Sequence, residues 1–169
     1  GLNEVICYSL IGNDEQGKLL AAYGAPTPYS PLLGAEGQYL VPCALAAEEC
    51  IQLANPLAPE HRMMRTTLLP SLLRTVRDNL RYQKRVTIFE VANVYLPRRG
   101  QQLPDEPRHL GIAMTGARES AWWAGKQAEP PAPMDFYDLK GVLETLLEQL
   151  GARTVSYLPS DSLIFQPGR

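Results

Sequence analysis

The strongest constraint on the fold of this chain is a stripe of apolar residues that leads directly into a long β-forming run. Between residues 68 and 82, leucines and a valine recur at spacings of three and four, which is typical of one face of an α-helix. The stripe consists of Leu68, Leu69, Leu72, Leu73, Val76 and Leu80. Pro70 suits the first turn, where a missing N–H costs little. The sequence therefore predicts a helix over roughly residues 68–82 that buries its leucines.

The run RVTIFEVANVYLP, residues 85–97, is rich in β-branched and aromatic residues and predicts a strand that ends at Pro97. A polar turn at 98–107 leads to a return strand at 109–116, so we expect an antiparallel pair. Further strands are expected at 4–10, 49–56 and 154–159, and a short helix at 13–24. Antiparallel strands mixed with single helices, without a regular βαβ rhythm, indicate the α+β class.

A second long helix is predicted to begin after Asp135. Asp135 and Asp138 resemble a pair of acids, but their place at a helix start favours a cap and a first-turn acid. Its apolar face would comprise Leu139, Val142, Leu143, Leu146, Leu147 and Leu150. Gly151 is expected to end the helix.

The 169 residues fit one domain with its own core, and 45% hydrophobic with 20% charged residues is a globular composition. Residues 24–48 are rich in proline and glycine, and we expect a loop or an insertion there. No apolar run is long enough to predict a membrane span. Gly1 leads straight into an apolar run and the chain ends on PGR, so we expect a piece of a longer protein, cut at both ends.

Basic charge is concentrated in residues 60–85, which hold seven Lys or Arg residues and two acids, although the whole chain has a net charge of −2. Arg74, Arg77 and Arg81 follow the polar side of the leucine stripe. They suit a solvated helix face, which is the commonest explanation of such a pattern, or a surface for a partner subunit. Direct contact with RNA through Arg74, Arg81 and Tyr82 is a third interpretation.

No metal site is predicted, because His61 and His109 are far apart and the three cysteines form no CxxC motif. The cysteines are typical of small buried thiols. Trp122 and Trp123 favour packing over base stacking.

Four segments in the same order carry a resemblance to a known family. They are NPL…MRTTLLPSLLRTVRDN, IFEVANVY, DFYDLKGVLE and FQPGR, and GLNEVICYSL fits the first strand of the same module. Together they resemble the C-terminal half of the β-subunit of bacterial phenylalanyl-tRNA synthetase, a module similar to a class II synthetase core. The resemblance implies a mainly antiparallel sheet flanked by helices. It also implies a cytoplasmic assembly of two α and two β chains, in which the α chain joins phenylalanine to tRNA(Phe) with ATP and magnesium.

The same resemblance implies that this module has no catalytic or cofactor-binding residues of its own. Where the α chain carries a phosphate-binding arginine, this sequence has Leu96, and a leucine does not stabilise a phosphate. Arg98 and Arg99 are expected to be turn arginines. Leu68 offers no acid for an ammonium group, and the third class II motif would lie beyond Arg169.

Arg65 and Glu90 are expected to have a structural or interface role. Glu90 lies between Phe89 and Val91, so alternation places it on the opposite face of the strand, either buried against an arginine or in solvent. The fork of Arg65 suits inward hydrogen bonds to backbone carbonyls or to a carboxylate such as Glu90.

Three functions therefore compete. The sequence favours a non-catalytic assembly domain of the β chain that supports attachment of phenylalanine by the α chain. The alternatives are an autonomous tRNA-binding module that uses residues 60–85, and an independently active class II adenylating domain.

Overall fold

The computed structural model describes residues 1–15, 17–18, 49–98, 101–119, 132–152 and 154–157. The elements in chain order are β1 (Asn3–Glu4), β2 (Leu10–Ile11), the 3-10 helix η2 (Pro59–His61), β3 (Met63–Met64), α2 (Leu69–Asn79), β4 (Val86–Asn93), β5 (Arg108–Thr115) and α3 (Phe136–Gln149). The expected loop at 24–48, Arg99, Trp122 and Trp123 lie outside the described residues. Residues 13–15 and 17–18 are helical, as the sequence predicts for the start of the 13–24 segment.

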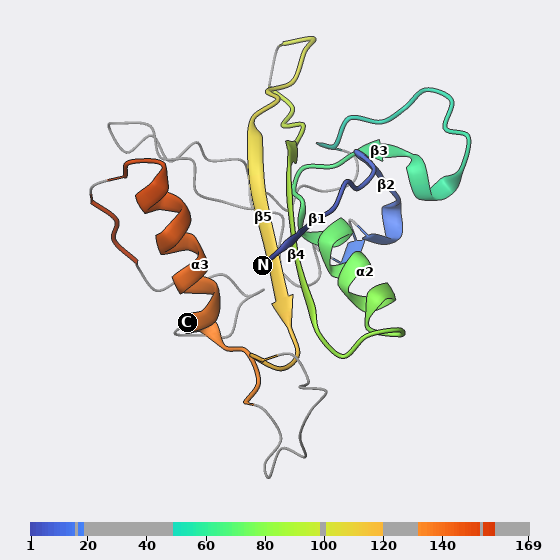
Figure 1. The fold of residues 1–169 in the computed structure, drawn as a ribbon. Coiled ribbons are helices and arrows are strands. Elements are labelled where there is room, and N and C mark those ends of the chain that lie inside the picture. The colour runs from blue at the N-terminus through green and yellow to red at the C-terminus, as the bar shows by residue number, and fades with distance from the viewer. Residues whose placement is uncertain (16, 19–48, 99–100, 120–131, 153, 158–169) are drawn as a thin grey trace.

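Figure 1 shows a central sheet with α2 on one side and α3 on the other. The sheet has the order β1-β4-β5. β4 and β5 form the predicted antiparallel pair over eight residues each, from Val86 opposite Thr115 to Asn93 opposite Arg108. β1 runs parallel to β4, and β2 pairs antiparallel with β3. The class is α+β as predicted, and the three-stranded sheet is mixed.

Several predicted elements are shorter than expected. The strand predicted at 4–10 is divided into β1 and β2. Its ladder with β4 continues as far as the N–H of Val5, after which the N–H of Cys7 donates to the side chain of Glu90 instead. The strand predicted at 49–56 is reduced to one isolated bridge, between Gln52 and Met63. Residues 154–157 form no strand.

α2 ends at Asn79, and in the turn that follows the backbone oxygen of Asn79 accepts the N–H groups of Tyr82 and Gln83. The helix packs against β4 and β5. At Gly111 on β5, an added Cβ would collide with Leu72 and press on Leu68. The glycine therefore allows the close approach of helix and sheet.

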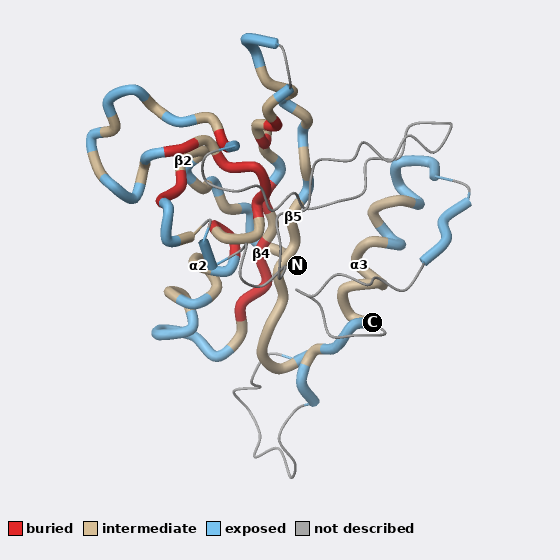
Figure 2. The backbone as a smooth tube through the Cα atoms, turned by 180° about the vertical axis from the view of Figure 1, so that it is seen from behind, coloured by how far each residue is buried: buried red, intermediate tan, exposed pale blue. Residues whose placement is uncertain are grey.

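The hydrophobic core lies between α2, the sheet and the β2–β3 pair, and Figure 2 shows the buried backbone concentrated there. Its members are Ile11, Cys50, Met63, Leu68, Leu72, Val86, Ile88, Val94 and Leu96. The predicted stripe was too wide. Leu72 is 1% exposed, but Leu73 is 56% exposed and Leu80 is also exposed. Successive side chains are about 100° apart around the helix axis, so Leu73 points away from the sheet that Leu72 contacts, and only part of the stripe is buried.

α3 begins and ends where the sequence predicts. Asp135 caps it in a reciprocal capping box with Asp138, and Gly151 has a positive φ of 80° just beyond its last turn. None of its residues is fully buried, and Leu150 is exposed. The predicted apolar face is therefore only partly covered in the described structure. No helix among the described residues has the length and apolar character to span a membrane.

Candidate functional site

The most deeply buried polar contact in the described structure joins Arg65 to Glu90. Glu90 lies in the middle of β4, on the same face as the buried residues Val86 and Ile88. Arg65 follows β3 directly. Its Nη1 lies 2.9 Å from Oε1 of Glu90, and the two side chains are 1% and 2% exposed. The contact expected from the sequence is present.

Arg65 also donates to backbone oxygens in the interior. Its Nε donates to the backbone oxygen of Asn93 at 3.2 Å, and its Nη1 approaches the backbone oxygen of Tyr8 at 3.4 Å. The backbone of Arg65 is fixed on both sides, because its N–H donates to Ser9 and its oxygen accepts from Tyr95. One side chain thus joins three segments that are far apart in sequence.

Cys7 closes this cluster from the N-terminal side. Its N–H donates to Oε1 of Glu90 at 3.1 Å, and its Sγ lies 3.6 Å from Oγ1 of Thr75 on α2. The Thr75 hydroxyl donates to the backbone oxygen of Ser71, so it is free to accept the thiol proton. Burial, assisted by the charge of Glu90, raises the pKa of the Cys7 thiol above its usual value.

The arrangement is a buried contact that supports the surrounding segments. A buried carboxylate is stabilised by paired donors, and Oε1 of Glu90 receives two of them. The guanidinium N–H groups of Arg65 are not accessible to solvent, since only 1% of its side chain is exposed. Neither group is placed to meet a phosphate or a substrate carboxylate arriving from solvent.

The position that the resemblance assigns to a phosphate-binding arginine is occupied by a core residue. Leu96 is 3% exposed and belongs to the hydrophobic core. Its backbone pairs with Asp105 through two hydrogen bonds of 2.8 and 2.9 Å. Arg98, two residues further on, forms an ion pair with the carboxylate of the same Asp105. Arg98 therefore acts as a turn arginine, as the sequence suggested.

The arginines of α2 and of the turn after it lie near acids. Arg74 forms an ion pair with Glu15, and Nη2 of Arg77 lies 2.9 Å from Oδ1 of Asp78. Arg81 is more distant from Asp78, at 3.9 Å. The hydrogen bond from Arg77 lowers the pKa of Asp78.

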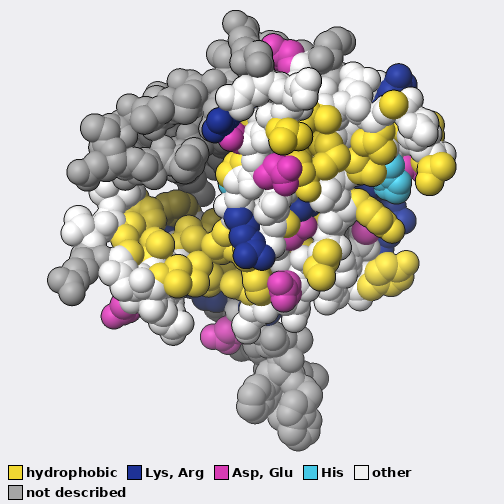
Figure 3. Space-filling view, turned by 90° about the horizontal axis from the view of Figure 1, so that it is seen from above, with side chains coloured by type: hydrophobic (Ala, Val, Ile, Leu, Met, Phe, Trp, Pro, Cys, Tyr) yellow, Lys and Arg dark blue, Asp and Glu magenta, His cyan; other side chains and the backbone are white. Residues whose placement is uncertain are grey.

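Large apolar side chains are exposed at several places on the described surface. Ile6 and Tyr8 project from the segment between β1 and β2, and Tyr8 contacts the ring of His61 with 4.9 Å between ring centroids. Seen from above, hydrophobic side chains gather towards α3 and again on the opposite side of the sheet (Figure 3). These groups show where the described surface is suited to contact with other protein segments.

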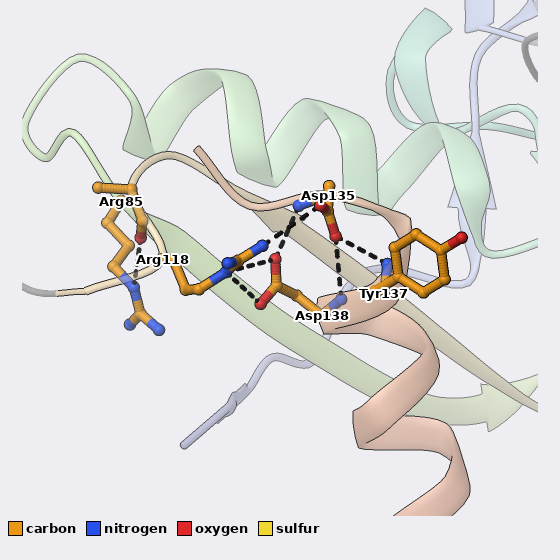
Figure 4. A network of polar contacts seen from close by, with 6 residues as sticks. Arg85, Arg118, Asp135, Tyr137 and Asp138 are labelled. Carbon is orange, nitrogen blue, oxygen red and sulfur yellow. Dashed lines mark hydrogen bonds and ion pairs between the residues drawn. The ribbon is translucent and has the colours of Figure 1, made fainter. Parts of the chain in front are cut away.

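A second polar network fixes the start of α3 (Figure 4). The guanidinium of Arg118 lies between two carboxylates, with Nε 2.9 Å from Asp138 and Nη2 3.2 Å from Asp135. The backbone N–H of Asp135 and then Arg118 lower the pKa of Asp138. Next to it, Nε of Arg85 donates to the backbone oxygen of Ala117 at 3.1 Å. Asp135 and Asp138 thus have the capping role that the sequence predicted.

Arg118 and Cys7 are the participants that the sequence did not reveal. Arg118 contacts acids 17 and 20 residues away, and Cys7 contacts Glu90 across 83 residues. No spacing pattern signals contacts of this kind. The part of the chain that the structure describes contains no group of three or more His, Cys, Asp or Glu side chains that would hold a metal ion.

Comparison with known proteins gives consistent results at the level of sequence. The sequence model of the family described as "Phenylalanyl tRNA synthetase beta chain CLM domain" matches residues 1–169. The phenylalanine–tRNA ligase beta subunit of Symbiobacterium thermophilum is 44% identical over 121 residues, which cover 71% of this chain and 13% of that protein. The same subunit of Geobacter metallireducens is 35% identical over 172 residues, covering 100% of this chain and 18% of that protein.

Among solved structures, pyrrolysyl-tRNA synthetase from Desulfitobacterium hafniense has a similar fold, with a TM-score of 0.52 and 18% sequence identity. The match covers 97% of this chain and 46% of that one. At this identity the likeness concerns the fold alone. The family match over the whole chain and the identities of its relatives show that the chain belongs to the family of phenylalanyl-tRNA synthetase beta-chain CLM domains.

Proposed function

We propose that residues 1–169 form a non-catalytic structural and assembly domain within the beta chain of a phenylalanine–tRNA ligase. The observation that carries the proposal is the burial of Leu96 in the core at the position where the resemblance expects a phosphate-binding arginine. A transition state that develops charge on phosphate requires donors aimed at it, and an aliphatic side chain supplies none. Arg98, the described arginine that follows it, is paired with Asp105.

In this proposal the chemistry belongs to the whole enzyme. The relatives are named phenylalanine–tRNA ligase beta subunits, and this chain covers 13% and 18% of the length of two of them. ATP, magnesium and phenylalanine would bind the alpha subunit of a cytoplasmic assembly of two alpha and two beta chains, which also binds tRNA(Phe). This domain would hold no cofactor.

Its own contribution would be a rigid surface for assembly. Arg65 and Glu90 fix the segment around Cys7 and Tyr8 from the inside through its backbone, so that the exposed side chains of that segment keep one orientation. Pre-organised surfaces lose less conformational entropy on association. A buried pair in this position supports the assembly role without taking part in the reaction.

The test uses the complete enzyme, assembled from the full-length beta chain and the alpha subunit, and measures phenylalanine-dependent exchange of pyrophosphate into ATP. Arg98→Ala in the beta chain should leave the exchange rate unchanged, because its guanidinium would serve only the turn. Lys140→Ala, a charge on α3 that pairs with Glu144, is a matched control for loss of one positive charge.

A fall of about 100-fold or more in the exchange rate with Arg98→Ala alone, with assembly intact, is the size expected for loss of a catalytic donor. That result would assign adenylate formation to this domain and would refute the proposal.

A further inference from the structure

We propose that the turn at residues 80–85, called here the basic turn, is a contact surface for RNA, with Arg81 and Lys84 on phosphates and Tyr82 stacked on an unpaired base. The inference rests on the proposed function, because membership of a tRNA ligase is what would bring RNA to this surface. The inference locates the RNA contact, within the basic segment at residues 60–85, at one exposed turn.

In the basic segment some arginines lie close to an acid, whereas others are exposed and further from one; Arg62, before β3, is exposed as well. Arg65 is buried against Glu90, and Arg74 is paired with Glu15. Arg77 contacts Asp78 at 2.9 Å. Arg77 and Arg81 are similarly exposed, at 64% and 69%, but Arg81 lies further from Asp78, at 3.9 Å. Lys84 is exposed as well.

The basic turn is held in one conformation from its base. The backbone oxygen of Asn79 accepts the N–H of Tyr82 at 2.9 Å and that of Gln83 at 3.1 Å. The Gln83 amide donates to Oδ1 of Asn79 at 3.3 Å. At the far side, Arg85 donates to the backbone oxygen of Ala117. Because the backbone of the turn is already ordered, little conformational entropy is lost on binding, and this favours affinity.

The exposed ring of Tyr82 is the feature that identifies the ligand. Its side chain is 90% exposed, and its ring takes part in none of the ring contacts found among the described residues. An exposed aromatic face between a cation at the preceding position and another two residues later matches a nucleotide, whose base stacks while the phosphates on either side meet the cations.

An acidic protein segment is a poorer fit for this surface. Protein interfaces have an apolar core surrounded by a polar rim, whereas the basic turn offers only the ring of Tyr82 and the exposed Leu80 among polar side chains. RNA requires no apolar core, because stacking and phosphate contacts supply the affinity. The chemistry of the basic turn therefore favours a single-stranded or looped part of an RNA.

The experiment measures the affinity of a tRNA(Phe) transcript for the complete enzyme over a range of salt concentrations. Tyr82→Ala should weaken binding by about 5- to 100-fold, the loss expected for one stacked base. Tyr82→Phe, which keeps the ring, should bind as the unmodified enzyme does. The double variant Arg81→Gln/Lys84→Gln should lower the salt slope by roughly 1.4, at about 0.7 per phosphate contact on a single strand.

Arg98→Gln is the matched control, since Arg98 is an exposed arginine that follows the last residue of β4, whereas the basic turn precedes the first, and it is paired with Asp105. It should leave both affinity and salt slope unchanged. All these side chains are on the surface, so thermal unfolding should confirm that each variant is folded.

The RNA contact is refuted if Tyr82→Ala and the double variant bind tRNA as tightly as the unmodified enzyme does. It is also refuted if their loss of affinity is explained by dissociation of the alpha subunit, which sedimentation would detect. Exchange of pyrophosphate into ATP needs no tRNA and should be unchanged by any of them. Failure of the RNA contact is thus distinct from failure of the assembly role, which the exchange assay with Arg98→Ala decides.

Discussion

Arg65 and Glu90, which are 25 residues apart, form an ion pair of 2.9 Å that is almost wholly removed from solvent. The two side chains occupy the space between β4 and the segment after β3, where apolar core residues would otherwise be expected. Hydrogen bonds offset part of the cost of burying two charges: Oε1 of Glu90 accepts from Arg65 and from Cys7, whereas its Oε2 is buried without a hydrogen-bond partner. Through Cys7, Tyr8 and Asn93 the pair fixes the relative positions of the first segment of the chain and the central strand.

Removal of one partner should be strongly destabilising. Arg65→Met should lower the free energy of unfolding by about 3–5 kcal/mol, because it leaves the carboxylate of Glu90 buried without its cation. Replacing both partners, as in Arg65→Met with Glu90→Leu, should cost less than the single change. Urea unfolding of the folded chain measures the difference, and Arg77→Met at an exposed pair should cause no measurable loss.

Equal effects of Arg65→Met and Arg77→Met would show that the buried pair contributes nothing beyond a surface contact. A double variant less stable than the single one would show that the charges themselves are favourable there.

Leu72 and Leu73 offer a matched pair of neighbouring leucines with opposite surroundings. Leu72→Ala should destabilise the fold by about 2–5 kcal/mol, because it opens a cavity between α2 and β5. Leu73→Ala should be close to neutral, since 56% of Leu73 is exposed. The two midpoints of thermal unfolding, measured under the same conditions, provide the comparison. Equal losses at the two positions would contradict the packing described for α2.

His109 should make stability depend on pH below neutrality. Its side chain is half-buried on β5, and burial lowers its pKa below the unfolded value of about 6.5. The unfolded chain therefore binds the proton more readily than the folded chain. Stability from this group is fully present above pH of about 6.5 and decreases as the pH falls towards the folded pKa.

Chemical unfolding of the unmodified chain and of His109→Gln, measured on both sides of that pH, isolates this contribution. The difference in stability between the two proteins should shift in favour of the variant as the pH falls. A difference that stays constant across the window would show that His109 is as solvated in the folded chain as in the unfolded one.

Local signals in the sequence predicted the elements whose residues interact with near neighbours. The cap of α3 at Asp135 and its end at Gly151 depend on backbone geometry within one turn, and both are present. The β4–β5 pair follows from two β-forming runs joined by a polar turn, and it too is present. The helix with the apolar stripe was placed correctly but extended three residues too far, because the turn that Asn79 closes has no distinct sequence signal.

The candidate site divides in the same way. Alternation of side chains along β4 placed Glu90 on the face opposite to its neighbours. The several N–H donors of a guanidinium made Arg65 a reasonable partner for this carboxylate. Nothing in the sequence indicated that Cys7 would complete the cluster, since its contact is a backbone N–H donated across the sheet. The same contact explains why the first predicted strand divides: a ladder hydrogen bond is exchanged for one to a buried carboxylate.

We propose that this domain supports a ligase without binding the nucleotide of the reaction. The most direct test is isothermal titration of the purified chain, shown to be folded by circular dichroism, with magnesium ATP and then with phenylalanine. Neither ligand should give a heat of binding. Saturable binding of ATP at micromolar concentration that is lost in Arg98→Ala would show that Arg98 replaces the arginine missing at Leu96, and would contradict the claim.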